Sequence, residues 1–191
     1  MTTPNRRIAL AAGAAALLSI AGGAFADAPF GPRPGGPAPP IGALDDQTGR
    51  PRRLLELAGQ KGVVLMFFRS AAWCPFCQAQ LIAMNDGAAD IESRGYKIVG
   101  VSYDKPSVNA EFTERRKITY TLLSDPGSKT IDAWGLRDPQ YPAGNLAYGV
   151  PRPIIFVIDR KGRIQASLAE ATFRTRPPVS EVLKAIDALP R

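Results

Sequence analysis

The 191-residue sequence contains no histidine and only two cysteines. Without histidine there is no Ser–His–Asp triad, no histidine general base, and no histidine ligand for haem or copper. Two cysteines are also too few for the four thiolates of a structural zinc or iron–sulfur site. Any catalysis must therefore come from thiols, carboxylates, arginines or the backbone, and we expect no cofactor.

The charge balance and the apolar content are those of an ordinary globular protein. The chain has 24 Lys and Arg residues against 17 Asp and Glu, a net charge of +7, and 45% hydrophobic residues. A chain of this length can bury a self-sufficient core, which favours a single domain. The basic residues are scattered and are not interleaved with aromatic residues, so we expect no nucleic-acid partner.

The first 26 residues have the pattern of a secretory signal peptide. Arg6 and Arg7 precede an apolar run over residues 8–23, and residues 24–26 (AFA) supply the small residues that precede a cleavage site. The run is shorter than the roughly 20 residues that cross a bilayer, which disfavours the alternative of a membrane anchor. We therefore predict cleavage near Ala26, export to the periplasm or the exterior, and no stable membrane span in the mature chain.

Residues 27–40 (DAPFGPRPGGPAPP) are rich in proline and glycine and contain little that could be buried. Such a composition is typical of an extended linker. We predict that the globular domain covers residues 41–191.

The apolar spacing beyond this segment predicts an α/β domain. Strands are expected at 63–68, 96–102, 121–123, 154–158 and 163–166, and helices at 78–94, 107–117, 128–134 and 179–189. The first strand is wholly apolar, as in a parallel strand buried on both faces, and the residues 159–162 favour a hairpin between the last two strands. This order predicts a central mixed sheet with helices on both faces.

Both cysteines lie in the segment Trp73-Cys74-Pro75-Phe76-Cys77, between the first predicted strand and the first predicted helix. The unpaired N–H groups at a helix N-terminus stabilise a thiolate. The spacing places the second sulfur one helical turn behind the first. We therefore predict that Cys74 is the attacking thiol and that Cys77 resolves the mixed disulfide.

Three alternatives compete with a redox-active pair. A structural disulfide would close a loop so small that it removes little entropy from the unfolded chain. A metal site would need two more ligands, with no other cysteine or histidine to supply them. A redox-inert binding module of the same fold would have no use for the intact pair.

The segment 67–77 (FFRSAAWCPFC) is similar to the active-site segment of thioredoxin-fold redoxins. It most resembles the peroxiredoxin-like branch of the alkyl hydroperoxide reductase/thiol-specific antioxidant family. Further matches lie at 95–104 (GYKIVGVSYD), 123–126 (LSDP) and 153–159 (PIIFVID), so the similarity covers about residues 38–189. The resemblance implies a thioredoxin-like fold and either thiol–disulfide or peroxide chemistry at the first cysteine.

Two positions depart from the family pattern. Typical peroxiredoxins place Thr or Ser three residues before the attacking cysteine, where its hydroxyl orients the peroxide, and this chain has Ala71. They also place an arginine six residues before the Asp that closes the later strand, and this chain has Pro153. Thioredoxins have a cis-proline facing the disulfide at that place. We therefore predict a cis Arg152–Pro153 bond and a preference for disulfides over peroxide.

Other residues around the pair are assigned lesser roles. Arg69 and Arg152 are candidates to replace the missing positive charge, and Ser70 is a candidate for the missing hydroxyl. Asp104, at the end of a predicted strand, is assigned either a proton relay or a turn. The residues predicted to position the substrate are Trp73, Pro75, Arg69, Arg152 and Pro153.

The leading hypothesis is an exported thiol–disulfide oxidoreductase that uses Cys74 and Cys77. The alternative is a thiol-dependent peroxidase in which Cys74 is oxidised to sulfenic acid and Cys77 condenses with it. The expected partners are accordingly a protein disulfide or dithiol, or a peroxide, together with a thiol electron donor.

Overall fold

A computed structural model describes residues 30–190. The predicted signal peptide, the first residues of the predicted linker and Arg191 lie outside the described residues. Within residues 30–190, no helix is long and apolar enough to cross a membrane.

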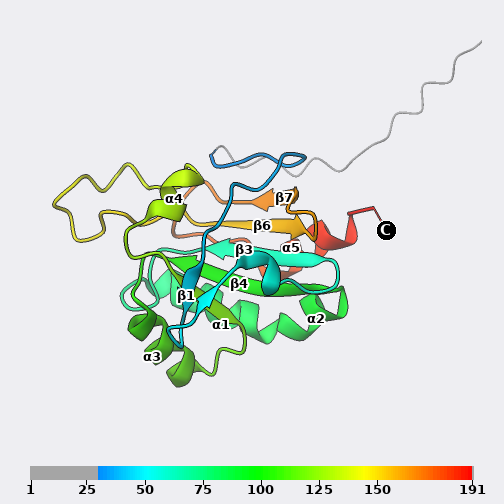
Figure 1. Cartoon of the computed structure of the whole chain (residues 1–191), viewed down its shortest axis with the longest axis horizontal. Coiled ribbons are helices and arrows are strands. Elements are labelled where there is room, and N and C mark those ends of the chain that lie inside the picture. Colours follow the sequence, from blue (N-terminus) through cyan, green and yellow to red (C-terminus); the bar gives the residue numbers. More distant parts are fainter. Residues whose placement is uncertain (1–29, 191) are drawn as a thin grey trace, which may run out of the picture.

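Seven strands form one sheet in the order β2-β1-β5-β4-β3-β6-β7 (Figure 1). Strands β3, β4 and β5 are parallel, whereas β6 runs antiparallel to β3, β7 to β6, and β1 to β5. The strands are β1 (Leu44–Asp46), β2 (Pro51–Arg52), β3 (Gly62–Phe67), β4 (Tyr96–Ser102), β5 (Thr121–Ser124), β6 (Ile154–Asp159) and β7 (Ile164–Leu168). The predicted mixed sheet is confirmed.

Helices cover both faces of the sheet, as predicted. They are α1 (Pro75–Asp86), α2 (Ala88–Ser93), α3 (Pro106–Arg116), α4 (Lys129–Ala133) and α5 (Val179–Asp187), with a 3₁₀ turn η1 (Leu54–Glu56). The single helix predicted over 78–94 is divided at Gly87, which caps α1 and precedes α2. A Cβ on Gly87 would lie only 2.5 Å from Val179, so the absence of a side chain lets the start of α5 pack against this break.

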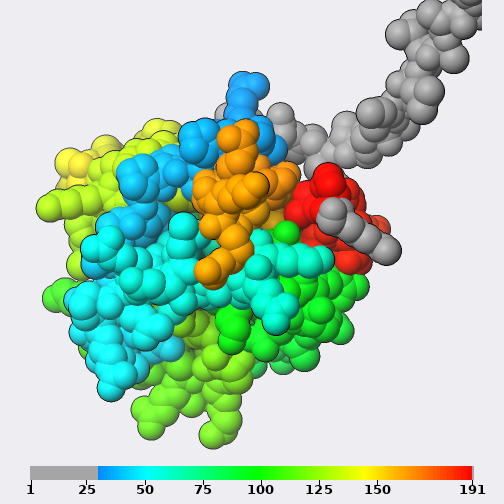
Figure 2. Space-filling model, turned by 45° about the vertical axis from the view of Figure 1, so that its right-hand side comes forward, coloured from blue at the N-terminus to red at the C-terminus, as the bar shows by residue number. Residues whose placement is uncertain are grey.

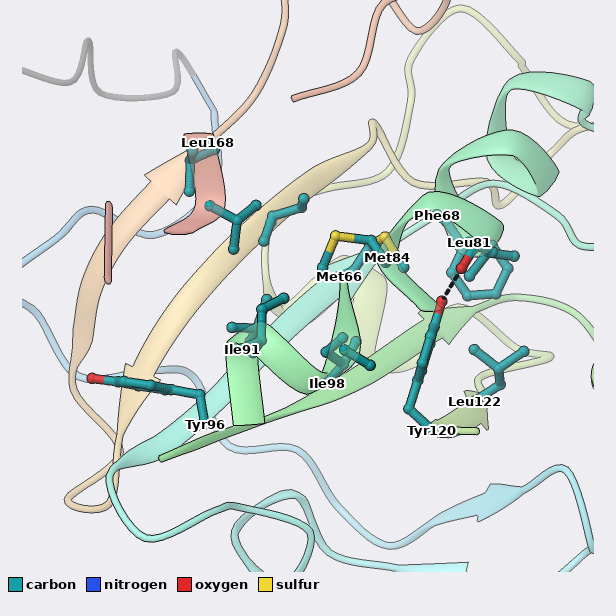
Figure 3. Packing of buried hydrophobic residues seen from close by; sticks show 14 of the residues in the cluster. Met66, Phe68, Leu81, Met84, Ile91, Tyr96, Ile98, Tyr120, Leu122 and Leu168 are labelled. Carbon is teal, nitrogen blue, oxygen red and sulfur yellow. Dashed lines mark hydrogen bonds between the residues drawn. The ribbon is translucent and has the colours of Figure 1, made fainter. Parts of the chain in front are cut away.

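The alternating side chains of β3 supply two hydrophobic cores. Val64 and Met66, with Phe68 just beyond the strand, belong to the cluster that also contains residues of α1, α2, α3 and α5. Figure 3 shows Met66 and Phe68 among these side chains, with the Tyr120 hydroxyl donating to the Leu81 carbonyl. On the other face, Leu65 and Phe67 belong to the cluster built from β6, η1 and the segment around α4. Because β3 is buried on both faces, its end is held rigidly where the cysteine segment begins.

The proline- and glycine-rich segment packs on the sheet where the structure describes it. The Gly35 N–H donates to the Ile164 carbonyl, the Ile164 N–H donates to the Gly36 carbonyl, and the Ala38 N–H donates to the Gly162 carbonyl. Figure 2 shows this blue segment against the orange β6–β7 hairpin. The segment therefore covers the start of the β7 edge, where it pairs with the backbone of Ile164. The composition of residues 27–40 predicts an extended linker. Composition carries no information about backbone hydrogen bonds to a strand that is distant in the sequence.

Three short elements, β1, β2 and η1, were not predicted. Strands of three and two residues are too short to show a period-two pattern. β1 is a strand because it pairs with β5. This pairing joins residues far apart in the sequence, so no local pattern indicates it.

Substitution of Phe67 tests the hydrophobic core next to the cysteine segment. Its ring is fully buried, with its centroid 5.0 Å from that of Trp134 and 6.2 Å from that of Phe156. Phe67→Ala should lower the free energy of unfolding by about 3–5 kcal/mol, because it leaves a cavity among these rings. Leu55→Ala, at a residue that is 42% exposed, should change it by no more than about 0.5 kcal/mol. Urea unfolding of the two variants measures the difference, and equal losses would contradict this view of the core.

Candidate active site

The two cysteines form a disulfide within the first turn of α1. Cys74 is the N-cap residue of the helix, and its Sγ accepts a hydrogen bond from the Cys77 N–H at 3.3 Å. The Cα atoms are 5.2 Å apart. Cys74 is 2% exposed and Cys77 is fully buried. The strand-to-helix position predicted for the pair is therefore present, and Cys74 is the more accessible sulfur.

Pro75 occupies the first helical position of α1, where the missing N–H costs nothing and the fixed φ suits a helix start. Its place explains why the helix begins immediately after Cys74. The structure thus gives Pro75 a local structural role; its predicted role toward a substrate stays a prediction.

The carboxylate of Asp104, just after β4, holds the segment that carries Cys74. Ser70 Oγ donates to Asp104 Oδ1 at 2.9 Å, and the Ala71 N–H donates to Oδ2 at 2.7 Å. The same Ser70 Oγ accepts from the N–H groups of Ala72 and Trp73. These long-range contacts give Asp104 a structural role that differs from the predicted turn, and they engage the Ser70 hydroxyl in holding the segment in place. The proton relay stays a prediction.

The side chain of Gln78 also binds the backbone of the segment that precedes Cys74. Its Nε2 donates to the carbonyls of Ala71 and Ala72 at 2.8 and 3.0 Å. Because Gln78 lies on α1 itself, the helix and the segment preceding it are held together at the level of the disulfide.

Arg69 is enclosed by aromatic rings. It is 3% exposed, and its guanidinium carbon lies 5.1, 4.9 and 4.1 Å from the ring centroids of Trp73, Tyr141 and Phe173. Within residues 30–190 it has no carboxylate partner, and its Nε is buried without a hydrogen bond. Among the described residues, a positive charge that no acidic side chain neutralises is therefore held between these rings, and the role of Arg69 in place of the lost arginine stays a prediction.

Trp73 lies at the surface beside the cysteines. It is 44% exposed, its Nε1 donates to the Tyr103 hydroxyl at 3.0 Å, and the two rings meet edge to face. Its exposure shows that it is not part of the hydrophobic core. Its predicted role in positioning the substrate stays a prediction.

Arg176 contacts the disulfide, and sequence reasoning missed it. Its Nη2 donates toward Cys77 Sγ at 3.5 Å from the loop between β7 and α5. Burial, together with the charge of Arg69, lowers the pKa of Arg176 to about 10, so the guanidinium stays charged at neutral pH. No local pattern could have identified it, because 99 residues separate it from Cys77.

The prediction for Pro153 is wrong. No peptide bond within residues 30–190 is cis, so the Arg152–Pro153 bond is trans. The Arg152 N–H donates to the Leu136 carbonyl, which pairs the approach to β6 with the chain after α4. This backbone pairing holds the chain before β6 on an extended path.

The side chain of Arg152 contacts residues other than the two cysteines. Its Nη2 donates to the Gly135 carbonyl at 3.0 Å, and its guanidinium lies 4.1 Å from the centroid of the Phe30 ring. With Pro153 it lines a cavity of about 360 Å³ whose walls include Phe30 and Phe173 and neither cysteine. Arg176 therefore supplies positive charge beside the disulfide, whereas Arg152 lies against the Gly135 carbonyl and the Phe30 ring.

Comparison with known proteins identifies the family. The family described as AhpC/TSA matches residues 34–167. The chain belongs to this family. It is 32% identical over 154 residues to a chloroplastic peroxiredoxin Q of Populus jackii, covering 81% of this chain and 68% of the relative. It is 31% identical over 134 residues to peroxiredoxin Bcp of Escherichia coli K12, covering 70% of this chain and 84% of the relative.

A solved structure shows the same fold. Peroxidoxin BcpB of Mycobacterium tuberculosis superposes with a TM-score of 0.69 at 27% identity, covering 85% of this chain and 98% of the other. The predicted family, the thioredoxin-like fold and the assignment as an oxidoreductase are thereby confirmed.

Asp104 gives a pH-dependent test of the segment that carries Cys74. Burial raises the pKa of this carboxyl, although its hydrogen bonds to Ala71 and Ser70 oppose the rise. The folded protein then binds the proton more tightly than the unfolded chain, whose Asp pKa is about 3.9. The contribution of Asp104 to stability should therefore be greatest below that pH and decline as the pH rises through the folded pKa.

The free energy of unfolding of the native protein, minus that of Asp104→Asn, should accordingly decrease as the pH rises above about 4. Urea titrations at several pH values measure this difference. Asp86→Asn, at an exposed residue of α1, controls for the loss of one negative charge. A difference that increases with pH for Asp104→Asn would show that its carboxylate is stabilised by folding, and the assignment would be wrong.

Proposed function

We propose that this protein is a thiol-dependent peroxidase in which Cys74 attacks the peroxide and Cys77 resolves the product. The leading expectation from the sequence was disulfide exchange with protein partners. The peroxidase alternative is better supported, since the relatives carry the name peroxiredoxin and the cis-proline that favoured disulfide exchange is absent from the described residues.

The observation that carries the proposal is the burial of Cys74 at the N-terminus of α1. Only 2% of the residue is exposed. A protein disulfide must bring one of its own sulfurs into line with the attacking sulfur, which needs open space around Cys74. A peroxide group has two oxygens and needs far less, so this site favours the small substrate.

The chemistry requires only groups that are present. The Cys74 thiolate attacks one peroxide oxygen, the O–O bond breaks, and the other oxygen leaves as an alcohol or water after taking a proton. Cys74 is then a sulfenic acid. The Cys77 thiolate attacks its sulfur, hydroxide leaves and is protonated to water, and the disulfide forms. A thiol donor returns both cysteines to the reduced state.

The structure supports the second step directly. The disulfide lies within one turn of α1, with both cysteines still in their places in the helix start. Resolution therefore needs no displacement of another strand or helix. The positive end of α1 and the guanidinium of Arg69 favour the thiolate form that the first step requires.

The roles of the two cysteines are tested by single variants. After one equivalent of hydrogen peroxide, Cys77→Ser should accumulate a sulfenic acid on Cys74, because the resolving thiol is missing. Cys74→Ser should accumulate at least about tenfold less, because Cys77 is fully buried. Mass spectrometry after labelling with a sulfenic-acid-selective nucleophile measures both. Equal labelling of the two variants would contradict the assignment.

Ala71 tests the substrate class. Its side chain is buried three residues before Cys74, where the family pattern places a hydroxyl. Ala71→Ser should raise the second-order rate constant with hydrogen peroxide several-fold, because the hydroxyl can orient the peroxide through a hydrogen bond worth roughly 1 kcal/mol. Ala72→Ser, at the exposed neighbour, is the matched control and should leave it unchanged. Equal rate constants for both variants would argue against a peroxide bound at this position.

We further propose that the protein is exported and that the donor is a thiol of the receiving compartment. The support is the pattern of residues 1–26. Expressed with its natural N-terminus in a bacterial host, the mature protein should begin at Asp27 and be recovered from the periplasmic fraction. Intact-mass measurement decides the point, and an uncleaved chain in the cytoplasmic fraction would contradict export.

A further inference from the structure

We propose that the Arg176 guanidinium stabilises Cys77 as the leaving thiolate when the Cys74–Cys77 disulfide is reduced. The inference rests on the proposed function for its place in a catalytic cycle. The step itself is disulfide reduction and can be measured without peroxide.

Arg176 is held in position by its own loop. Its Nη1 donates to the carbonyls of Phe173 and Thr175, which leaves Nη2 directed toward Cys77 Sγ at 3.5 Å. The loop is fixed in turn by Phe173, whose ring lies against both Phe76 of α1 and the guanidinium of Arg69. The charge therefore faces the sulfur of Cys77, and no acidic side chain within residues 30–190 holds it there.

The two sulfurs have separate hydrogen-bond donors. Cys74 Sγ accepts the Cys77 N–H of the helix start, whereas Cys77 Sγ is approached by Arg176. Cys77 is fully buried, so a negative charge on its sulfur has no contact with bulk water. A charge placed there is costly unless a cation or hydrogen-bond donor compensates it. Arg176 is the group in position to do so.

Reduction creates such a charge. The thiolate of a donor small enough to enter the site attacks the Sγ of Cys74, the slightly more exposed of the two residues, and forms a mixed disulfide with it. The Cys74–Cys77 bond breaks, and its electron pair stays on Cys77 Sγ as a thiolate. A leaving thiol with a lower pKa departs faster, so a guanidinium at Cys77 accelerates this step.

Arg69 is a second buried cation, and its charge adds to the effect of Arg176 on the reduction of the disulfide. Arg69 and Arg176 are buried close enough for the charge of Arg69 to lower the pKa of Arg176. In the disulfide state both sulfurs are neutral, and the two positive charges repel each other uncompensated. The thiolate formed on reduction relieves this repulsion, so the pair favours the reduced protein at equilibrium as well.

The test compares Arg176→Met, which removes the charge at similar length, with Arg176→Lys and with Arg174→Met. Arg174 is an exposed arginine of the same loop and serves as the matched control. Stopped-flow reduction of each disulfide by excess dithiothreitol gives the rate. Arg176→Met should be about tenfold slower than the native protein, Arg176→Lys should lie between them, and Arg174→Met should stay within about twofold.

Equilibration in glutathione buffers gives the thermodynamic effect. Arg176→Met should shift the equilibrium about tenfold toward the disulfide, which corresponds to about 30 mV for this two-electron couple. In the Cys74→Ser background, the pKa of the remaining Cys77 thiol should rise when Arg176 is replaced by Met. Thermal unfolding reports whether each variant is folded, and Arg176→Lys provides the comparison if Arg176→Met is not.

The reaction of reduced protein with hydrogen peroxide separates this role from a general effect on the site. Its rate constant should fall by a smaller factor than the reduction rate in Arg176→Met, since the sulfur that attacks the peroxide, Cys74 Sγ, has its own hydrogen-bond donor. Equal slowing of peroxide oxidation and of reduction would overturn the proposal, and so would an unchanged reduction rate. A native protein that fails to react with peroxide would contradict the proposed function and leave the result on reduction intact.

Discussion

The carboxylate of Asp104 joins the end of β4 to the segment that follows β3, and the positions of both sulfurs depend on this contact. Its two oxygens accept from Ser70 and Ala71, immediately before the helix that Cys74 caps. Parallel strands β3 and β4 end at the same edge of the sheet, which brings Asp104 to the segment. A buried acidic side chain therefore holds this segment through hydrogen bonds, next to a site whose own chemistry requires positive charge.

That positive charge comes from places that are unrelated in sequence. The start of α1 provides backbone N–H groups, Arg69 lies beneath aromatic rings, and Arg176 approaches from the loop before α5. The helix start donates to Cys74 and Arg176 donates toward Cys77, whereas Arg69 is held between the rings of Trp73, Tyr141 and Phe173. A chain without histidine can in this way stabilise thiolates with groups that stay charged at neutral pH.

The loop over residues 169–178 contributes two side chains to the site. Phe173 contacts Arg69 and Phe76, and Arg176 contacts the disulfide itself. The loop connects β7 to α5, so the covering of the β7 edge by residues 35–38 supports the same hairpin from the other side. The proline- and glycine-rich segment thus belongs to the packed structure of the domain.

The sequence by itself determined the features that repeat or lie close together along the chain. The apolar run of β3, the helix starting at the cysteines and the hairpin at 159–162 follow from local spacing and turn chemistry, and so does the place of Cys74 at a helix N-terminus. Only the tertiary structure decided what contacts the sulfurs. The pairing of Arg152 with Leu136 before β6 and the approach of Arg176 to Cys77 both join segments that are distant in the sequence. Such pairings arise from where the sheet and loops bring backbone groups together, and no local pattern of side chains records them.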